Sequence, residues 1–164
     1  MCSSDLGPVE SRRRCGPVSV SARPLAFAGL CLLMATGLWA QMPKLMLFGG
    51  PKRDVYLGCL NCDAFASDSI CNEFGEYGSE VSANSIWNPA SSFGDQSSTL
   101  SPWNELGTRA PAIRDPNGNF YGYLSRNISH MRRTDLTVFQ ALLDLVGKLD
   151  LASAQKAFCS SDRK

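Results

Sequence analysis

The sequence contains a single histidine, His130, and only 19% of its residues are charged. One histidine excludes the imidazole clusters of catalytic zinc sites, and neither a nucleophile elbow nor a phosphate-binding glycine loop occurs. The formal net charge of +1 does not fit a basic nucleic-acid-binding surface. The sequence therefore indicates no catalytic residue, no metal, no cofactor and no nucleic-acid partner, and an enzyme is the less favoured class.

Positive charge is missing altogether between residues 54 and 107, where eight acidic residues occur without a lysine or arginine. This distribution disfavours phosphate-bearing partners and suits a cation, a basic peptide or simple solubility. A carboxylate-based hydrolase stays open as an alternative, although no pair of acids stands out. The eight residues are Asp54, Asp63, Asp68, Glu73, Glu76, Glu80, Asp95 and Glu105.

One long uncharged run is present, the 17 residues from Pro24 to Ala40, and it follows Arg12, Arg13, Arg14 and Arg23. A basic flank before such a run is typical of a secretory signal peptide, with an uncleaved anchor or a buried helix as alternatives. We expect contact with a membrane only through this segment, and only if it stays uncleaved.

The two ends of the chain, Met1 to Leu6 and Asp162 to Lys164, resemble translations of a sequencing adapter, and we expect neither to be native. We therefore expect residues 1–40 to comprise adapter-like residues and the signal peptide, and residues 41–53 to form a linker. A repeat and hairpin domain would follow at 54–127 and a C-terminal helical segment at 128–161, and residues 162–164 would be the adapter-like end.

Four of the seven cysteines follow the signal segment: Cys59, Cys62, Cys71 and Cys159. In an exported protein an even number of cysteines predicts disulfides. Three connectivities are possible, and we favour Cys62 with Cys71 and Cys59 with Cys159, because the second bond would tie the C-terminal helix to the start of the domain. The C-x-x-C spacing of Cys59 and Cys62 also matches half of a zinc site or a redox pair.

The chain aligns with itself at a shift of 16 positions. Three tetrads recur, at 69–72 (SICN), 85–88 (SIWN) and 101–104 (SPWN). Self-similarity at a fixed period indicates one structural unit used repeatedly. Because the period is short and rich in Gly, Ser, Asn and Pro, we expect each unit to be a short extended piece with a tight turn, with stacked aromatic residues and little helix.

The aromatic residues of these units have two interpretations. A small domain needs its large side chains in the core, which favours burial. Alternatively, a surface platform would stack on sugar rings or peptides, because exposed aromatic patches mark interaction sites. The candidate ligand-binding residues are Tyr77, Trp87, Phe93 and Trp103.

Residues 112–124 predict a β-hairpin, because Asp115, Pro116 and Gly118 have the chemistry of a tight turn. Strand alternation would place Tyr121 and Tyr123 on one face, opposite Phe120 and Leu124.

From Thr134 the apolar residues recur with a period of 3.6, which predicts an amphipathic helix capped by Thr134 or Asp135. Asp150 could cap a second short helix through Phe158. The expected fold class is α+β, with a small β-rich repeat region, a β-hairpin and a C-terminal amphipathic helix.

Three motifs carry a resemblance to a known group of proteins. Residues 55–58 (VYLG) precede a cysteine, the first tetrad is followed by Gly-x-Tyr-Gly-Ser at 75–79, and residues 115–123 read Asp-x-x-Gly-Asn-Phe-Tyr-Gly-Tyr. Over residues 54–127 the chain resembles a domain common in uncharacterised exported bacterial proteins. The resemblance implies a bacterial, exported origin, and because that domain has no known activity it implies no residue role.

Together these features predict an exported, disulfide-stapled interaction module, secreted or periplasmic, with an unknown extracellular or cell-envelope ligand. The alternatives are a purely structural envelope domain and the carboxylate-based hydrolase. Burial of the four candidate aromatics would remove the main support for binding through them. Two carboxylates that converge in a cleft, or His130 beside a nucleophile, would favour an enzyme.

Overall fold

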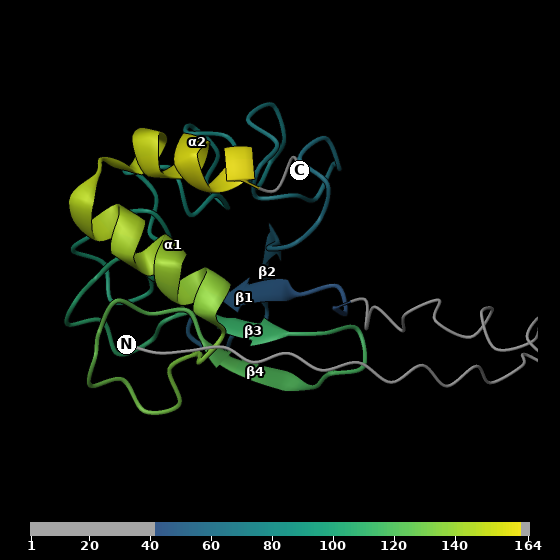
Figure 1. The fold of residues 1–164 in the computed structure, drawn as a ribbon. Coiled ribbons are helices and arrows are strands. Elements are labelled where there is room, and N and C mark those ends of the chain that lie inside the picture. The colour runs from purple at the N-terminus through teal and green to yellow at the C-terminus, as the bar shows by residue number, and fades with distance from the viewer. Residues whose placement is uncertain (1–41, 162–164) are drawn as a thin grey trace, which may run out of the picture. The chain divides into compact units, whose positions relative to one another are not determined.

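The computed structural model describes residues 42–161, and its centre is a four-stranded antiparallel sheet (Figure 1). The strands are β1 (Met46–Gly49), β2 (Val55–Cys59), β3 (Ala112–Arg114) and β4 (Phe120–Tyr123), in the spatial order β2-β1-β3-β4. Two helices, α1 (Thr137–Lys148) and α2 (Leu151–Ser161), complete the α+β fold predicted from the sequence. The predicted signal segment and both adapter-like ends lie outside the described residues.

Strand β1 lies within the segment 41–53 that the sequence analysis assigned to a linker, so that assignment is wrong for this part. The strand pairs with β2 on one side and with β3 on the other. Leu45 and Leu47 are fully buried on the core side. A linker cannot occupy this position, because a central strand must satisfy its backbone groups on both edges.

Helix α1 buries the predicted apolar stripe, namely Phe139, Leu142, Leu143 and Val146. Its N-cap is Leu136, which makes no side-chain capping bond, so neither Thr134 nor Asp135 caps it. The N–H of Leu136 donates instead to the Thr134 hydroxyl, and the helix begins one or two residues later than predicted, at Thr137. Asp150 does cap α2 by accepting the N–H of Ser153. Within residues 42–161, neither helix is long and apolar enough to cross a membrane.

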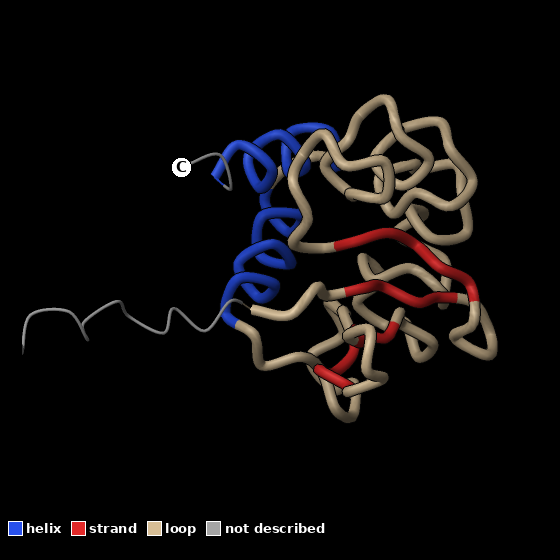
Figure 2. The backbone as a smooth tube through the Cα atoms, turned by 90° about the vertical axis from the view of Figure 1, so that its right-hand side faces the viewer, coloured by secondary structure: helices blue, strands red, loops and turns tan. Residues whose placement is uncertain are grey.

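The repeat region is a chain of turns rather than strands, and Figure 2 shows its tube winding beside the helices. Between Asp63 and Ser79, four backbone hydrogen bonds join residues three positions apart, and a fifth joins residues four positions apart, from the Ser79 N–H to the Gly75 carbonyl. The same series continues from Ser79 to Asp95. Each unit is thus one coil of 16 residues, which we number coil 1 (63–78), coil 2 (79–94) and coil 3 (95–110).

The Ser and Asn of each tetrad hold these coils in shape. In coil 2, the Ser85 hydroxyl accepts the N–H of Trp87, and the Asn88 side-chain oxygen accepts the N–H of Ala90. The Asn88 amide also donates back to the carbonyl of Ser82 at 2.9 Å. Coils 1 and 3 make the equivalent bonds. Side chains that bond to nearby backbone groups favour turns over the hydrogen-bond ladders of β-sheets. This preference explains why the three coils contain no strand.

The indole rings connect one coil to the next. Trp87 donates to the Ile70 carbonyl at 2.8 Å, and Trp103 donates to the Ile86 carbonyl at 2.5 Å. The two rings stack with their centroids 5.4 Å apart. Each tryptophan therefore fills the core and also satisfies a carbonyl of the preceding coil.

Two disulfides form, Cys59–Cys62 and Cys71–Cys159, so the favoured pairing of Cys62 with Cys71 and Cys59 with Cys159 is wrong. Cys71 occupies the tetrad position that holds tryptophan in the other coils, so it points inward, where Cys159 of α2 lies. Cys59 and Cys62 lie on one tight loop with their Cα atoms 5.6 Å apart. The four cysteines are those predicted, and their pairing is consistent with an oxidising compartment.

The predicted hairpin between β3 and β4 is present, and its turn is built around the carboxylate of Asp115. This carboxylate accepts the N–H groups of Asn117 and Asn119, the Asn119 amide and the Tyr121 hydroxyl. These bonds, the one from the Asn119 side chain first, hold the pKa of Asp115 below its usual value. The charged carboxylate is therefore bound more tightly in the folded state than in the unfolded chain.

We expect Asp115→Asn to weaken the acid dependence of stability. Because folding lowers the pKa of Asp115, its ionised carboxylate stabilises the fold at pH values above its pKa in the unfolded chain, about 4. That contribution is lost as the pH falls through the pKa of Asp115 in the folded state. The variant should have a lower urea midpoint at pH 7 and a smaller loss of midpoint from pH 5 to pH 2. Asp54→Asn, at an exposed position outside this turn, should follow the wild-type profile. Parallel profiles for wild type and Asp115→Asn would contradict the prediction.

Candidate functional site

The structure places the four predicted ligand-binding residues mostly inside the molecule. Trp87 and Trp103 are 0% and 1% exposed and Phe93 is 9% exposed, while Tyr77 is half-buried. Phe93 lies against β1, where a Cβ on Gly49 would come within 2.9 Å of its ring. The surface platform is therefore wrong for Trp87, Phe93 and Trp103, and the alternative of core packing describes them.

A different set of aromatic residues lies on the outer face of the sheet. Leu47 and Ile113 pair across β1 and β3 and are buried in the core, so their neighbours along each strand point to the opposite face. On that face the Phe48 and Tyr56 rings lie 5.5 Å apart, and the Phe120 and Tyr123 rings 4.9 Å apart. All four are half-buried. The outer face of an antiparallel sheet is commonly polar, and here it is aromatic.

Three arginines stack on these rings. The guanidinium carbon of Arg132 lies 4.3 Å from the Phe120 centroid, that of Arg53 4.5 Å from Tyr123, and that of Arg114 5.8 Å from Phe48. Such contacts are favourable because the face of an aromatic ring is electronegative. We call this surface the aromatic face; it consists of Phe48, Arg53, Tyr56, Arg114, Phe120, Tyr123 and Arg132.

A bulge in β4 brings Phe120 and Tyr123 to one face. Arg114 pairs with Phe120 and Ala112 with Tyr123, so β4 uses one residue more than β3 over the same stretch. Gly122 absorbs the irregularity with a φ of 99°. Simple alternation, which grouped Tyr123 with Tyr121, is therefore wrong: Tyr121 packs against the core and Tyr123 lies outside.

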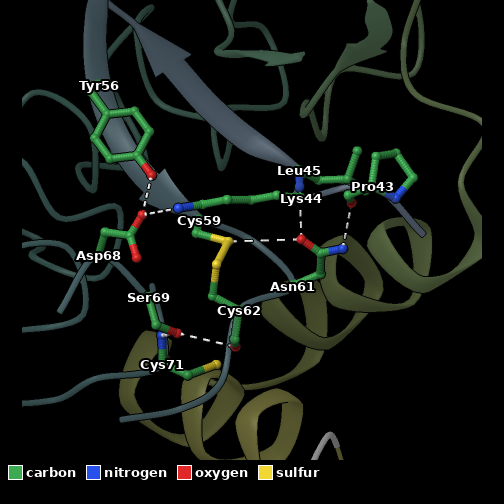
Figure 3. The surroundings of a disulfide bond; sticks show 10 residues. All are labelled: Pro43, Lys44, Leu45, Tyr56, Cys59, Asn61, Cys62, Asp68, Ser69 and Cys71. Atoms are coloured by element: carbon green, nitrogen blue, oxygen red, sulfur yellow. Dashed lines mark hydrogen bonds and ion pairs between the residues drawn. A yellow bond between two sulfur atoms is a disulfide. The ribbon is translucent and has the colours of Figure 1, made fainter. Parts of the chain in front are cut away.

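Tyr56 is fixed at one edge of the aromatic face by the contacts drawn in Figure 3. Its hydroxyl donates to Asp68 at 2.8 Å, and the Lys44 ammonium donates to the same oxygen at 2.6 Å. The bond from Lys44 lowers the pKa of Asp68, with a smaller contribution from Tyr56. Burial first, and the bond to Asp68 second, raise the pKa of Tyr56 well above its usual range. Tyr56 is therefore a neutral, oriented ring at neutral pH.

No protein-family model, curated protein or solved structure matches this chain. What its surfaces can do must therefore follow from their own residues. Two surfaces differ in charge: the aromatic face has three arginines, whereas residues 54–107 of the sequence have eight acidic residues and no basic one.

Three acidic residues meet at one hollow of the domain, and local hydrogen bonds favour the ionised form of two of them. Glu80, Asp95 and Asp150 line one hollow of about 440 Å³ between the repeat and the start of α2. Backbone and hydroxyl groups of Ser97 lower the pKa of Asp95, and those of Ser153 lower the pKa of Asp150. A carboxyl with a lowered pKa is a poor proton donor near neutral pH. Among residues 42–161, no three carboxylate, imidazole or thiol groups lie close enough to hold a metal ion.

His130 contacts no nucleophilic side chain in the part of the chain that the structure describes. Its ring nitrogens lie 2.9 Å from the Met131 carbonyl and 3.3 Å from that of Thr108, and its ring packs on Tyr123 at 4.9 Å. It therefore supports one edge of the aromatic face. We find no chemical role for it beyond this packing.

The aromatic face could not be predicted from the sequence, because β1 and β4 were not assigned correctly. Phe48 fell in the expected linker, and Phe120 and Tyr123 were placed on opposite faces. A usable signal was present in the run Leu45, Met46, Leu47 and Phe48 followed by Gly-Gly-Pro, which is typical of a strand entering a turn. The bulge at Gly122 had no comparable signal.

Proposed function

We propose that this protein is an interaction module of an oxidising compartment, secreted or periplasmic, that binds its ligand across the aromatic face. One observation carries the proposal: aromatic rings from β1, β2 and β4, together with stacked guanidiniums, occupy a sheet face that is not part of the core. Aromatic and arginine side chains are enriched at binding surfaces, and the aromatic rings supply large contact areas at a low cost in conformational entropy.

The two disulfides support this placement and this role. An oxidising compartment keeps them formed, and Cys71–Cys159 ties α2 to the first coil. The sheet is thereby held on a rigid frame, and a rigid surface loses less entropy when it binds.

The proposal is tested with an array of neutral and acidic glycans, peptidoglycan fragments and peptides, probed with the oxidised protein. We expect Phe120→Ala and Tyr123→Ala each to weaken binding about tenfold, because each removes an anchor ring. Phe74→Ala is the matched control, since Phe74 is 99% exposed on coil 1 and lies outside the aromatic face. It should bind as the wild type does.

Loss of fold is separated from loss of binding by Phe48→Leu, which removes a ring but keeps apolar volume. This variant should melt near the wild-type temperature and still bind more weakly. Equal losses for Phe120→Ala and Phe74→Ala would place the binding surface elsewhere. Absence of binding to every probe would favour a purely structural envelope domain.

A further inference from the structure

We propose that the ligand of the aromatic face is a carboxylate-bearing polysaccharide; this inference rests on the function proposed above. Arg53, Arg114 and Arg132 bring three positive charges to the aromatic face. The ion pairs within residues 42–161 are Lys44–Asp68 and Arg126–Glu105, and none of the three arginines takes part in them. Arg53 donates one hydrogen bond, to the Ala110 carbonyl at 3.3 Å. Three guanidiniums on one face thus have no carboxylate partner in the described part of the chain.

A stacked guanidinium can still bind an anion. When a guanidinium lies flat on a ring, the N–H groups along its edge stay available as a planar fork of donors. That fork matches the two oxygens of a carboxylate, and such charge-assisted bonds are among the stronger ones in proteins. The arginines are therefore presented for recognition of an acid.

The aromatic rings indicate which chemical groups separate the carboxylates of the ligand. The four rings Phe48, Tyr56, Phe120 and Tyr123 are half-buried, so each keeps an exposed apolar part, and the Tyr56 ring has no guanidinium over it. A pyranose ring has apolar C–H faces that pack on aromatic rings, and its hydroxyls remain in water. Four strands spaced about 4.8 Å apart make the face about 14 Å wide, which suits an extended chain of sugars. A uronic-acid polymer supplies both sugar rings and spaced carboxylates.

A nucleic acid fits these observations less well. Duplex DNA carries about one charge per 1.7 Å, and its binding depends on many phosphate contacts. Residues 54–107 place eight acidic side chains and no basic one in the same small domain, and they would repel so dense a polyanion. A polyuronate has one charge per sugar at most, so the repulsion is weaker.

The test uses immobilised polygalacturonate, alginate and hyaluronan, each beside its methyl ester, which keeps the backbone and removes the charge. Binding of the oxidised full chain is measured by biolayer interferometry at increasing NaCl. We expect at least one acid polymer to bind about tenfold more tightly than its ester, and salt to weaken that binding. Arg114→Gln and Arg132→Gln should each lower the affinity for it about tenfold. Lys156→Gln, which removes an exposed charge on α2, should have no such effect.

The possible failures are distinguishable. Equal binding to acid and ester, lost in Tyr123→Ala, would overturn the carboxylate proposal and keep the aromatic face as a binding surface. Binding to none of the acid polymers would overturn the proposal, as would preferred binding to duplex DNA or to anionic phospholipid vesicles. Self-association that Arg114→Gln abolishes would assign the face to a second copy of the chain. Arg114→Lys, which keeps the charge without the fork, should recover only part of the affinity if the fold is intact.

Discussion

Removing the disulfide between Cys71 and Cys159 by the double substitution Cys71→Ala and Cys159→Ala is expected to destabilise the domain severely. This bond closes a loop over a sequence separation of 88 residues. Loop-closure entropy predicts a loss of about 4.6 kcal/mol for a loop of this size. Small domains have a total stability of about 5–15 kcal/mol, so the variant should lose between about a third and nine-tenths of it. Urea denaturation followed by circular dichroism would measure this loss.

The other disulfide provides the matched control. Cys59 and Cys62 are separated by only 3 positions, and the same relation gives about 2 kcal/mol for so short a loop. The double substitution Cys59→Ala and Cys62→Ala should therefore cost less than half as much. If the two double variants unfolded at the same urea concentration, the entropic account of the longer loop would be wrong.

The substitution Gly94→Ala is expected to cost about 3 kcal/mol, because the coil leaves no space for a methyl group. An added Cβ would lie 2.0 Å from the Asn88 carbonyl oxygen, which is backbone and cannot move without breaking the turn. That carbonyl accepts the N–H of Ser91 in the coil. Gly78 occupies the same position in coil 1, with an added Cβ 2.2 Å from the Asn72 carbonyl oxygen, so Gly78→Ala should behave alike.

Gly147→Ala is the control for these glycine substitutions. Gly147 lies in α1, and an added Cβ would meet only the flexible end of Arg126 at 3.0 Å. Alanine in a helix is more favourable than glycine by about 1 kcal/mol, so this variant should be neutral or more stable. Thermal unfolding would rank the variants, and a melting temperature for Gly94→Ala within 2 °C of the wild type, on the order of a 0.5 kcal/mol change, would show that the coil can relax.

Local sequence patterns were sufficient to predict the elements that contacts between nearby residues stabilise. The stripe from Phe139 to Val146 placed α1, and the side chain of Asp115 placed the turn of the hairpin. The 16-residue spacing marked the stretch in which the Ser and Asn bonds of the turns recur. The predicted N-cap of α1 was wrong, because the Thr134 hydroxyl accepts the N–H of Leu136 before the helix begins.

The candidate site depended on contacts that no local pattern contains. The sequence favoured the core for Trp87 and Trp103 but left a surface position open, and the stacking of one coil on the next places their indoles inside. Phe48 joins the aromatic face because β1 inserts between β2 and β3, strands that are more than 50 residues apart in the chain. Tyr123 joins it because Gly122 shifts the register.

The amino-acid sequence by itself determined the α+β class, the 16-residue period of the tetrads, the hairpin, the two helices and the four cysteines that pair. These follow from periodicity, turn chemistry and composition, which act over a few residues. The tertiary structure alone decided which cysteines pair, which aromatics are buried and which face of the sheet gathers the arginines. Those outcomes depend on strand order and register, which are set by packing between residues far apart in the chain.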